Sequence, residues 1–300
     1  MMRHLLIAAI VMMPAVSVQE DPAAIVKEGQ KLESGGKRTE ALEKYQAALK
    51  LNPKQFDAHI GIGRVMVVDG KVAEGRKHIQ QALEMAPENG INPSLSSLAV
   101  AWMFDGNVGE AAKAYQKVFD RQIQAGARDA AAGTANALGR AYLESGDLAN
   151  AEKWYRQGYE TSQKIDKLTP EQTDLWAMRW HHAQGRIAAR RKDPAEAKKQ
   201  IEAVKALVDK GTLDEFQRSN LPHLEGYVAF YDGRYDDAIA ALTKADQNDP
   251  FILGLLAQAY EGKKDAARAR ELYQKVVDTP GFSLQAAIAR RVAQEKLARG

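Results

Sequence analysis

The chain has 300 residues, of which 45% are hydrophobic and 27% are charged, a composition typical of folded globular proteins and not of disordered ones. Its 42 lysines and arginines nearly balance its 39 aspartates and glutamates. The resulting net charge of +3 gives no reason to expect a nucleic acid or an anionic membrane as partner. Because the sequence contains no cysteine, it excludes disulfides, cysteine-ligated zinc or iron–sulfur sites, and a thiol nucleophile.

Residues 1–17 have the pattern of a secretory signal peptide. Arg3 precedes an apolar run from Leu5 to Met13, which is too short to span a membrane. The small residues that follow predict cleavage after Ser17, export to a bacterial periplasm, and a short linker over residues 18–21. The alternative is an uncleaved N-terminus that anchors the protein in the inner membrane.

From residue 22 onward the sequence repeats with a period near 34 residues. Seven windows, each starting with one of Pro22, Phe56, Asn92, Ala132, Met178, Ser219 and Pro250, share small residues at two positions. The eighth position of each window holds Gly29, Gly63, Ala99, Gly139, Gly185, Gly226 and Ala257. The twentieth holds Ala41, Gly75, Ala111, Ala151, Ala197, Ala238 and Ala269. A large aromatic or aliphatic residue, such as Tyr45 or Tyr273, occupies the twenty-fourth. Each window therefore predicts two helices that approach closely at the small residues.

This spacing resembles that of the tetratricopeptide repeat family. The resemblance implies an all-α, right-handed solenoid of about seven helix-turn-helix repeats over residues 22–281. Residues 282–300 then form a capping helix, in which Leu284, Ile288 and Val292 lie on one apolar face. The fifth window is the least regular, because Lys192 stands where most windows have a turn glycine. Proline is expected only between helices or at their starts.

The windows are longest around residues 152–190. Residues 152–167 predict a lengthened second helix, and Thr169-Pro170 predicts the start of an equally long helix through Trp176 and Trp180. We expect this pair of helices to protrude. The two tryptophans are four residues apart and share one helix face, so they form either an exposed second docking surface or a contact with the preceding helix.

No motif in the sequence predicts catalysis. The chain has no Walker loop, no Gly-x-Ser-x-Gly elbow and no His-Glu-x-x-His, and Gly61-x-Gly63 belongs to the repeat. The histidines outside the signal segment lack metal-ligand spacing, since neighbours such as His181 and His182 point in different directions on a helix. We therefore expect no catalytic residue, metal or cofactor.

The first helix of each repeat is expected to line a concave groove. In the first three windows the groove positions are mostly apolar, as at Val26, Ile60, Val67, Val100 and Met103, and later windows place polar residues there. The candidate partner-binding residues are Arg64, Asn136, Arg140, His182, Arg186, Arg190, His223, Tyr227 and Tyr231. Arginine forks and an asparagine amide in this arrangement can hold a carboxylate. In the alternative interpretation, the arginines pair with acids such as Glu144, and Tyr227 packs between repeats.

These features predict a non-catalytic scaffold in the cell envelope that binds an acidic or carboxylate-bearing protein or peptide partner in the groove. The carboxylate clamp known in the family uses Lys and Asn on the first helix, and Val26 and Gln30 occupy those positions here. A chaperone tail is therefore not expected as partner. The alternative is a small-ligand or glycan-binding periplasmic component, or a non-catalytic subunit of an envelope enzyme. In that case a sharply curved array closes a pocket around His182, Arg186, His223 and Tyr231.

Overall fold

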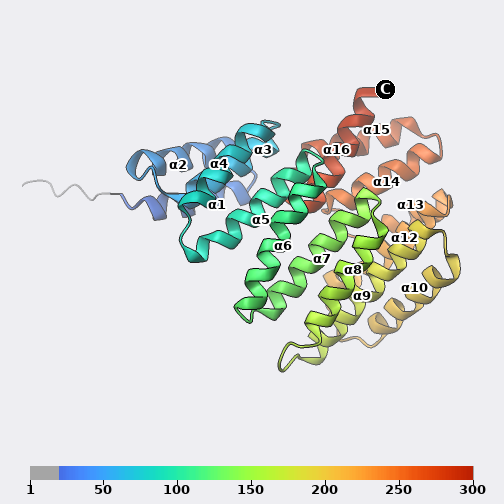
Figure 1. Cartoon of the computed structure of the whole chain (residues 1–300). Helices are drawn as coiled ribbons and strands as arrows, with labels where there is room; N and C mark the ends of the chain where they lie inside the picture. The colour runs from blue at the N-terminus through green and yellow to red at the C-terminus, as the bar shows by residue number, and fades with distance from the viewer. Residues whose placement is uncertain (1–19, 300) are drawn as a thin grey trace, which may run out of the picture.

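The computed structural model describes residues 20–299, so the predicted signal peptide and its cleavage site lie outside the described residues. These residues form sixteen helices and no strand (Figure 1). Fourteen helices pair as seven hairpins, which confirms the predicted repeats. The hairpins are α1 (Pro22–Ser34) with α2 (Arg38–Leu51), α3 (Phe56–Val68) with α4 (Val72–Met85), α5 (Glu88–Phe104) with α6 (Val108–Gln124), α7 (Arg128–Ser145) with α8 (Leu148–Ser162), α9 (Pro170–Arg191) with α10 (Pro194–Asp209), α12 (Asn220–Tyr231) with α13 (Tyr235–Leu242), and α14 (Pro250–Gly262) with α15 (Ala266–Asp278). The remaining two are the one-turn helix α11 (Glu215–Arg218) and the final helix α16 (Leu284–Arg299).

The small residues of the repeat allow the two helices of each hairpin to touch. A Cβ atom placed on Gly29 would lie only 2.7 Å from the ring of Tyr45, which is fully buried in the same hairpin. In the second hairpin a Cβ on Gly63 would lie 2.6 Å from the carbonyl oxygen of Gly75. The eighth position is therefore small because the large residue at the twenty-fourth occupies the space beside it.

The hairpin turns use a left-handed residue, as the turn glycines predict. Gly146 ends α7 with φ at 92°, a conformation that a side chain disfavours. In the fifth hairpin Lys192 adopts the same region, with φ at 58°, so the turn forms without glycine. The irregular fifth window is therefore a complete hairpin.

Two expectations about helix boundaries are wrong. The lengthened second helix stops early, because α8 ends at Ser162 and the chain turns through Lys167 before Thr169 caps α9. The additional length lies in α9, which has 22 residues. Pro93 is also inside α5 and not at its start, because that helix begins five residues earlier, at Glu88.

The two tryptophans of α9 do not form an exposed docking surface. Trp176 is only 3% exposed. The ring of Trp180 stacks on Tyr159 of α8, with centroids 5.2 Å apart. The start of α9 is held against the rest of the chain by Asp174, which accepts hydrogen bonds from Lys210 Nζ and Thr212 Oγ1, both at 2.8 Å. The two tryptophans are therefore covered, because α8 and the residues after α10 pack on this end of α9.

The C-terminal helix α16 closes the array on itself (Figure 1). It packs on α14 and α15 as a cap, and it also contacts α5 and α7 from earlier repeats. Arg290 donates a hydrogen bond to the carbonyl of Val68 at the end of α3 (2.7 Å) and another to the carbonyl of Val277. The rings of Phe104 and Phe282 stack 5.9 Å apart. Because α16 and the segment before it pack against α5, part of the predicted apolar groove is covered, and Val67 and Met103 are buried there.

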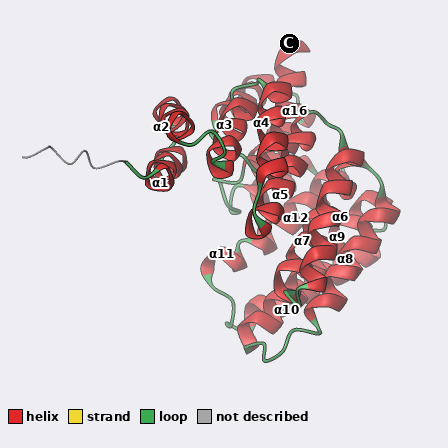
Figure 2. Cartoon of the chain, turned by 60° about the vertical axis from the view of Figure 1, so that its left-hand side comes forward, coloured by secondary structure: helices red, strands yellow, loops and turns green. Residues whose placement is uncertain are grey.

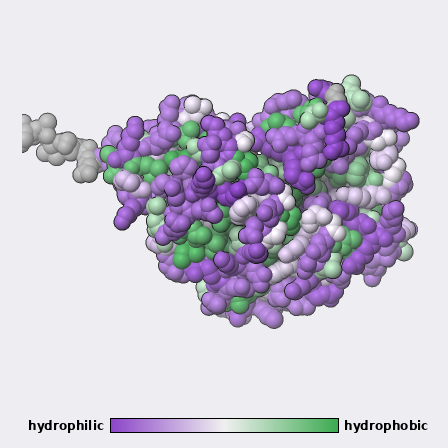
Figure 3. Space-filling view, turned by 45° about the horizontal axis from the view of Figure 1, so that its top comes forward, coloured by the Kyte–Doolittle hydropathy of each residue, from purple (hydrophilic) through white to green (hydrophobic). Residues whose placement is uncertain are grey.

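The face drawn in Figure 3 is mostly hydrophilic, with hydrophobic patches among the polar side chains. Over the described residues, the large exposed apolar side chains are few, namely Leu51, Ile123 and Phe216. Over residues 20–299, no helix combines the length and the apolar character that crossing a bilayer requires.

The contact of α16 with the earlier repeats predicts that the stability of the fold depends strongly on Arg290. Its side chain is 6% exposed, so Arg290→Gln leaves the buried carbonyl of Val68 and the half-buried carbonyl of Val277 without their donor and should lower the free energy of unfolding by about 2 kcal/mol. The matched control is Arg291→Gln, which removes only an exposed pair with Glu295 and should change it by less than about 0.5 kcal/mol. Urea unfolding measures both values, and equal effects of the two substitutions would contradict the role given to Arg290.

Glycine-to-alanine substitutions should have opposite effects at a close helix contact and at an open helix position. Gly75→Ala drives a methyl group into the carbonyl of Gly63 and should destabilise the fold by about 2 kcal/mol. Gly133→Ala adds a methyl group to an open position of α7 and should stabilise the fold by about 0.5–1 kcal/mol. Thermal unfolding of both variants tests this, and destabilisation by both would show that the close approach is not the cause.

Candidate functional site

The concave side of the array contains a half-open pocket of about 610 Å³, which we call the concave pocket. Its lining comes from α6, α7, α8, α9, α11, α12, α14 and α16, together with the loops before α11 and α14. The polar lining residues discussed below are Asn136, Arg140, Tyr155, His182, Arg186, Asp214, His223, Asp246 and Asp249. This volume lies within the range of about 300–1,000 Å³ that is usual for sites binding small molecules or single side chains.

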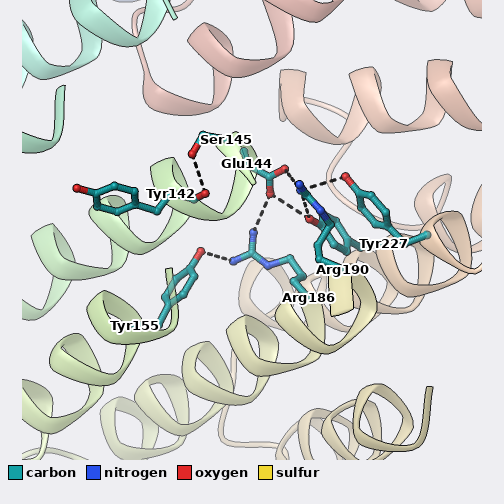
Figure 4. A network of polar contacts seen from close by, with 8 residues as sticks. Tyr142, Glu144, Ser145, Tyr155, Arg186, Arg190 and Tyr227 are labelled. Carbon is teal, nitrogen blue, oxygen red and sulfur yellow. Dashed lines mark hydrogen bonds and ion pairs between the residues drawn. The ribbon is translucent and has the colours of Figure 1, made fainter. Parts of the chain in front are cut away.

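A buried network beside the pocket joins three hairpins (Figure 4). The Glu144 carboxylate of α7 lies 3.7 Å from Arg186 Nη1 and 3.6 Å from Arg190 Nη1, both on α9. Arg186 Nη2 donates to the hydroxyl of Tyr155 on α8 at 2.8 Å, and the Tyr227 hydroxyl of α12 donates to Glu144 at 3.4 Å. One carboxylate is therefore shared by two arginines, which leaves a local excess of positive charge.

Burial governs the ionisation of these groups. It raises the pKa of the Glu144 carboxyl, although the guanidinium groups of Arg186, Arg140 and Arg190 oppose this shift. Burial also lowers the pKa of His182 and of His223 well below the ordinary value of 6.5, and Arg186 lowers both further. Both imidazoles are therefore neutral at pH 7, and the positive charge of the site comes from arginine.

Among the pocket residues, Arg140 has two hydrogen-bond donors on one edge of its guanidinium group that lack a partner in the described chain. Its Nε and Nη2 atoms are buried, and neither has a hydrogen-bond partner within residues 20–299. These two atoms form one edge of the guanidinium group, the edge that can donate to both oxygens of a carboxylate. The face of the same group lies 4.6 Å from the ring of Phe251, which fixes its plane. The geometry is that of a preformed seat for a planar oxyanion.

Further vacant polar atoms surround this seat. Arg186 Nε, His182 Nε2 and His223 Nε2 are buried and unpartnered in the described chain, and all three residues line the pocket. The two imidazole rings lie 4.9 Å apart. Since buried polar atoms are normally satisfied, several vacant ones on side chains that line one pocket point to a bound group that supplies their partners.

The structure brings together five of the nine predicted groove residues and separates the other four. Asn136, Arg140, His182, Arg186 and His223 line the concave pocket. Arg64 lies elsewhere, where it donates two hydrogen bonds to Glu33 at 2.9 and 2.6 Å beside a different cavity.

The other three predicted residues belong to the Glu144 network and not to the pocket lining. Arg190 Nη1 donates to the hydroxyls of Tyr227 and Tyr231 at 3.5 and 3.3 Å. Tyr227 is fully buried. The interpretation that placed Tyr227 in inter-repeat packing and paired arginines with Glu144 is therefore correct for this part of the array.

Sequence reasoning missed the residues that close the pocket. Ile252 comes from the start of α14 and Leu284 from the start of α16, and Phe251, beside Ile252, lies against Arg140 without lining the pocket itself. Phe216 comes from α11, which stands off the body of the array on the segment between α10 and α12 (Figure 2). Nothing local in the sequence marks these positions, because their place in the site depends on how far the array curves. Among the residues described, no three His, Asp or Glu side chains converge as metal ligands would.

Comparison with known families identifies the repeat. A tetratricopeptide repeat model matches residues 98–164 and 223–282, and a second model of the same repeat matches residues 29–70, so the matches cover more than half of the chain. The fifth hairpin, α9 with α10, lies between the matched ranges.

Solved structures of similar fold are distant in sequence. A tetratricopeptide repeat protein from Parabacteroides merdae is 14% identical over 92% of this chain and 97% of its own, with a TM-score of 0.57. The pilF protein of Pseudomonas aeruginosa is 13% identical over 85% of this chain and 97% of its own, with a TM-score of 0.51. At this identity the likeness concerns the fold alone.

Among curated proteins, peroxisomal targeting signal receptors of Komagataella phaffii and Pichia angusta are each 32% identical to a segment of this chain. The segments are 88 and 75 residues long, or 29% and 25% of this chain. This chain spans only about 15% and 13% of the length of these receptors.

The neutral histidines predict that stability falls in mild acid. Because the pKa of His182 and His223 is lower in the folded than in the unfolded chain, the unfolded chain binds more protons below pH 6.5. The free energy of unfolding should therefore fall by about 2 kcal/mol between pH 7 and 5.5 on account of these two groups. Replacing both with glutamine should remove most of this dependence, whereas the neighbouring His181→Gln, outside the pocket lining, should leave it unchanged. Urea unfolding at several pH values measures it, and an unaltered slope in the double variant would contradict the assignment.

Proposed function

The chain belongs to the tetratricopeptide repeat family, and from that premise we propose that it is a non-catalytic scaffold whose concave pocket holds a carboxylate group of a partner protein or peptide. The observation that carries the proposal is the vacant edge of Arg140. A fixed guanidinium with two free donors matches a carboxylate in shape and charge.

The surroundings of Arg140 support an anionic group. Arg186 and Arg190 share the single buried carboxylate of Glu144, and Arg140 adds a third positive charge nearby, so an added anion lowers the local excess of positive charge. His182 and His223 supply further vacant nitrogen atoms while remaining neutral. The names of the curated relatives describe receptors for a targeting signal, which supports a segment of another protein as the ligand.

The proposal includes the cell envelope as the place of action. The N-terminal pattern of Arg3, an apolar run and the small residues before Val18 supports export, with cleavage after Ser17 or retention as an inner-membrane anchor. A periplasmic scaffold without cysteine needs no oxidative folding.

A second candidate function is a small-ligand component of the envelope. The observation that favours it is the shape of the site, because α16 packs against α5 and α7 and the concave side then holds a half-open pocket bounded by the starts of α14 and α16. A carboxylate-bearing small molecule would use the same vacant edge of Arg140.

The test of the carboxylate seat is capture of partners from envelope extract. The wild-type chain should retain a protein that Arg140→Gln loses, since removing one side of a buried charged pair weakens binding by about 30-fold or more. The control Arg128→Gln alters an exposed residue at the start of the same helix, away from the pocket lining, and should retain the partner.

Two outcomes separate the candidates. A carboxylate-bearing small molecule, recovered from the purified wild-type chain by mass spectrometry and lost from Arg140→Gln, would favour the second function. Equal retention of every partner by wild type and Arg140→Gln would show that the seat has no role in binding.

A further inference from the structure

The concave pocket carries charges of opposite sign at different depths. Its inner part contains the buried Arg186 together with Arg140. Its outer part, which we call the acidic rim, consists of Asp214, Asp246 and Asp249, of which the first is exposed and the other two are half-buried. With the exposed Arg179 counted beside the three aspartates, the pocket is positive at its floor and has a net negative charge at its rim.

The three aspartates of the acidic rim outnumber the one exposed cation of the pocket lining, Arg179, and none of them is paired with it. Each aspartate uses its Oδ1 atom to accept a backbone N–H, from Gln217, Asn248 and Phe251 respectively, at 2.7 to 2.9 Å. None of the three forms an ion pair with a lysine, arginine or histidine of residues 20–299. The turns and helix starts therefore hold these carboxylates in place but leave their charge unpaired.

The wall between floor and rim is largely apolar. Leu175, Ile252 and Leu284 line it, and Phe216 of α11 adds a ring that is 70% exposed. An exposed phenylalanine beside a polar pocket can cover the apolar body of a ligand whose charged ends lie at the floor and at the rim.

We propose that the concave pocket binds a zwitterion, with its carboxylate on Arg140 and Arg186, its apolar body against Ile252 and Phe216, and its ammonium group beside the acidic rim. The proposal rests on the proposed function, in which the vacant edge of Arg140 is the carboxylate seat, and adds a position for the ammonium group of the ligand. It does not rest on the acids alone, because the vacant nitrogen atoms of Arg186, His182 and His223 point independently to a bound ligand.

Two kinds of molecule carry this chemistry. One is a free dipeptide-sized zwitterion, in which the α-amine is the cation. The other is the C-terminal end of a longer chain, in which a lysine side chain near the terminal carboxylate is the cation. Both place opposite charges on either side of an apolar group.

Calorimetric titration of the chain with four probes tests the proposal. The probes are the dipeptide Ala-Phe, its N-acetyl derivative without the amine, its C-terminal amide without the carboxylate, and N-acetyl-Lys-Ala-Phe with a side-chain cation. Relative to Ala-Phe, we expect amidation to weaken binding by about 30-fold or more and N-acetylation by about three- to fivefold.

Variants of the acidic rim test whether N-acetylation weakens binding because it removes the ammonium group that lies beside the rim. In Asp246→Asn with Asp249→Asn the amide oxygens still accept the backbone N–H groups, so the fold is kept while the charge is removed. In this variant N-acetylation should change affinity by less than about twofold. The control Asp193→Asn alters an aspartate that caps α10 in the same way but lies outside the pocket, and it should behave as wild type.

The outcomes separate this proposal from the proposed function. If N-acetyl-Ala-Phe binds as tightly as Ala-Phe and the amide does not bind, the carboxylate seat stands and the zwitterion is wrong. If no probe binds at millimolar concentration, or if Arg140→Gln binds all of them as wild type does, both proposals are wrong. Tighter binding of N-acetyl-Lys-Ala-Phe than of Ala-Phe supports a zwitterionic chain end, and the reverse order supports a free small molecule.

Discussion

The contact of α16 with the second and third hairpins is the constraint on which the rest of the structure depends. Arg290 is 222 residues from Val68 in the sequence, and its hydrogen bonds to the carbonyls of Val68 and Val277 join the end of α3 to the end of α15, so the second hairpin is held to the C-terminal part of the array. Phe282 on Phe104 adds apolar contact at the same junction. With α16 packed against α5 and α7, the concave side holds a half-open pocket bounded by the starts of α14 and α16.

The pocket gathers charge that the protein only partly neutralises. Moving a guanidinium group from water into the interior is unfavourable unless hydrogen bonds and an opposite charge compensate. Arg186 has Glu144 and the Tyr155 hydroxyl, yet its Nε atom is vacant, and Arg140 forms no ion pair within residues 20–299. Holding these unpartnered donors in one orientation therefore lowers the stability of the fold. The same arrangement reduces the conformational entropy that is lost when an anion binds.

The fold could be predicted well from the sequence and the site only in part. Gly29 with Tyr45 and Gly63 with Gly75 are local pairs, separated by fewer than twenty residues, and their spacing alone specifies a helical hairpin. Asn136, Arg140 and His182 were assigned to the concave side from their positions in the repeat, and they line the pocket. Arg64 has the same repeat position as Arg140, but the guanidinium group of Arg64 donates hydrogen bonds to the carboxylate of Glu33. The repeat pattern does not specify this pairing.

The sequence by itself determined the seven hairpins and the capping helix, because helix periodicity, small contact residues and turn glycines act within one or two repeats. Only the tertiary structure decided that Phe251 covers Arg140, that Trp176 is buried, and that the acidic rim faces the arginines. These contacts depend on curvature, which is the sum of a small rotation between successive hairpins. A few degrees at each step decide whether residues far apart in the chain meet, and no local pattern of residues records that sum.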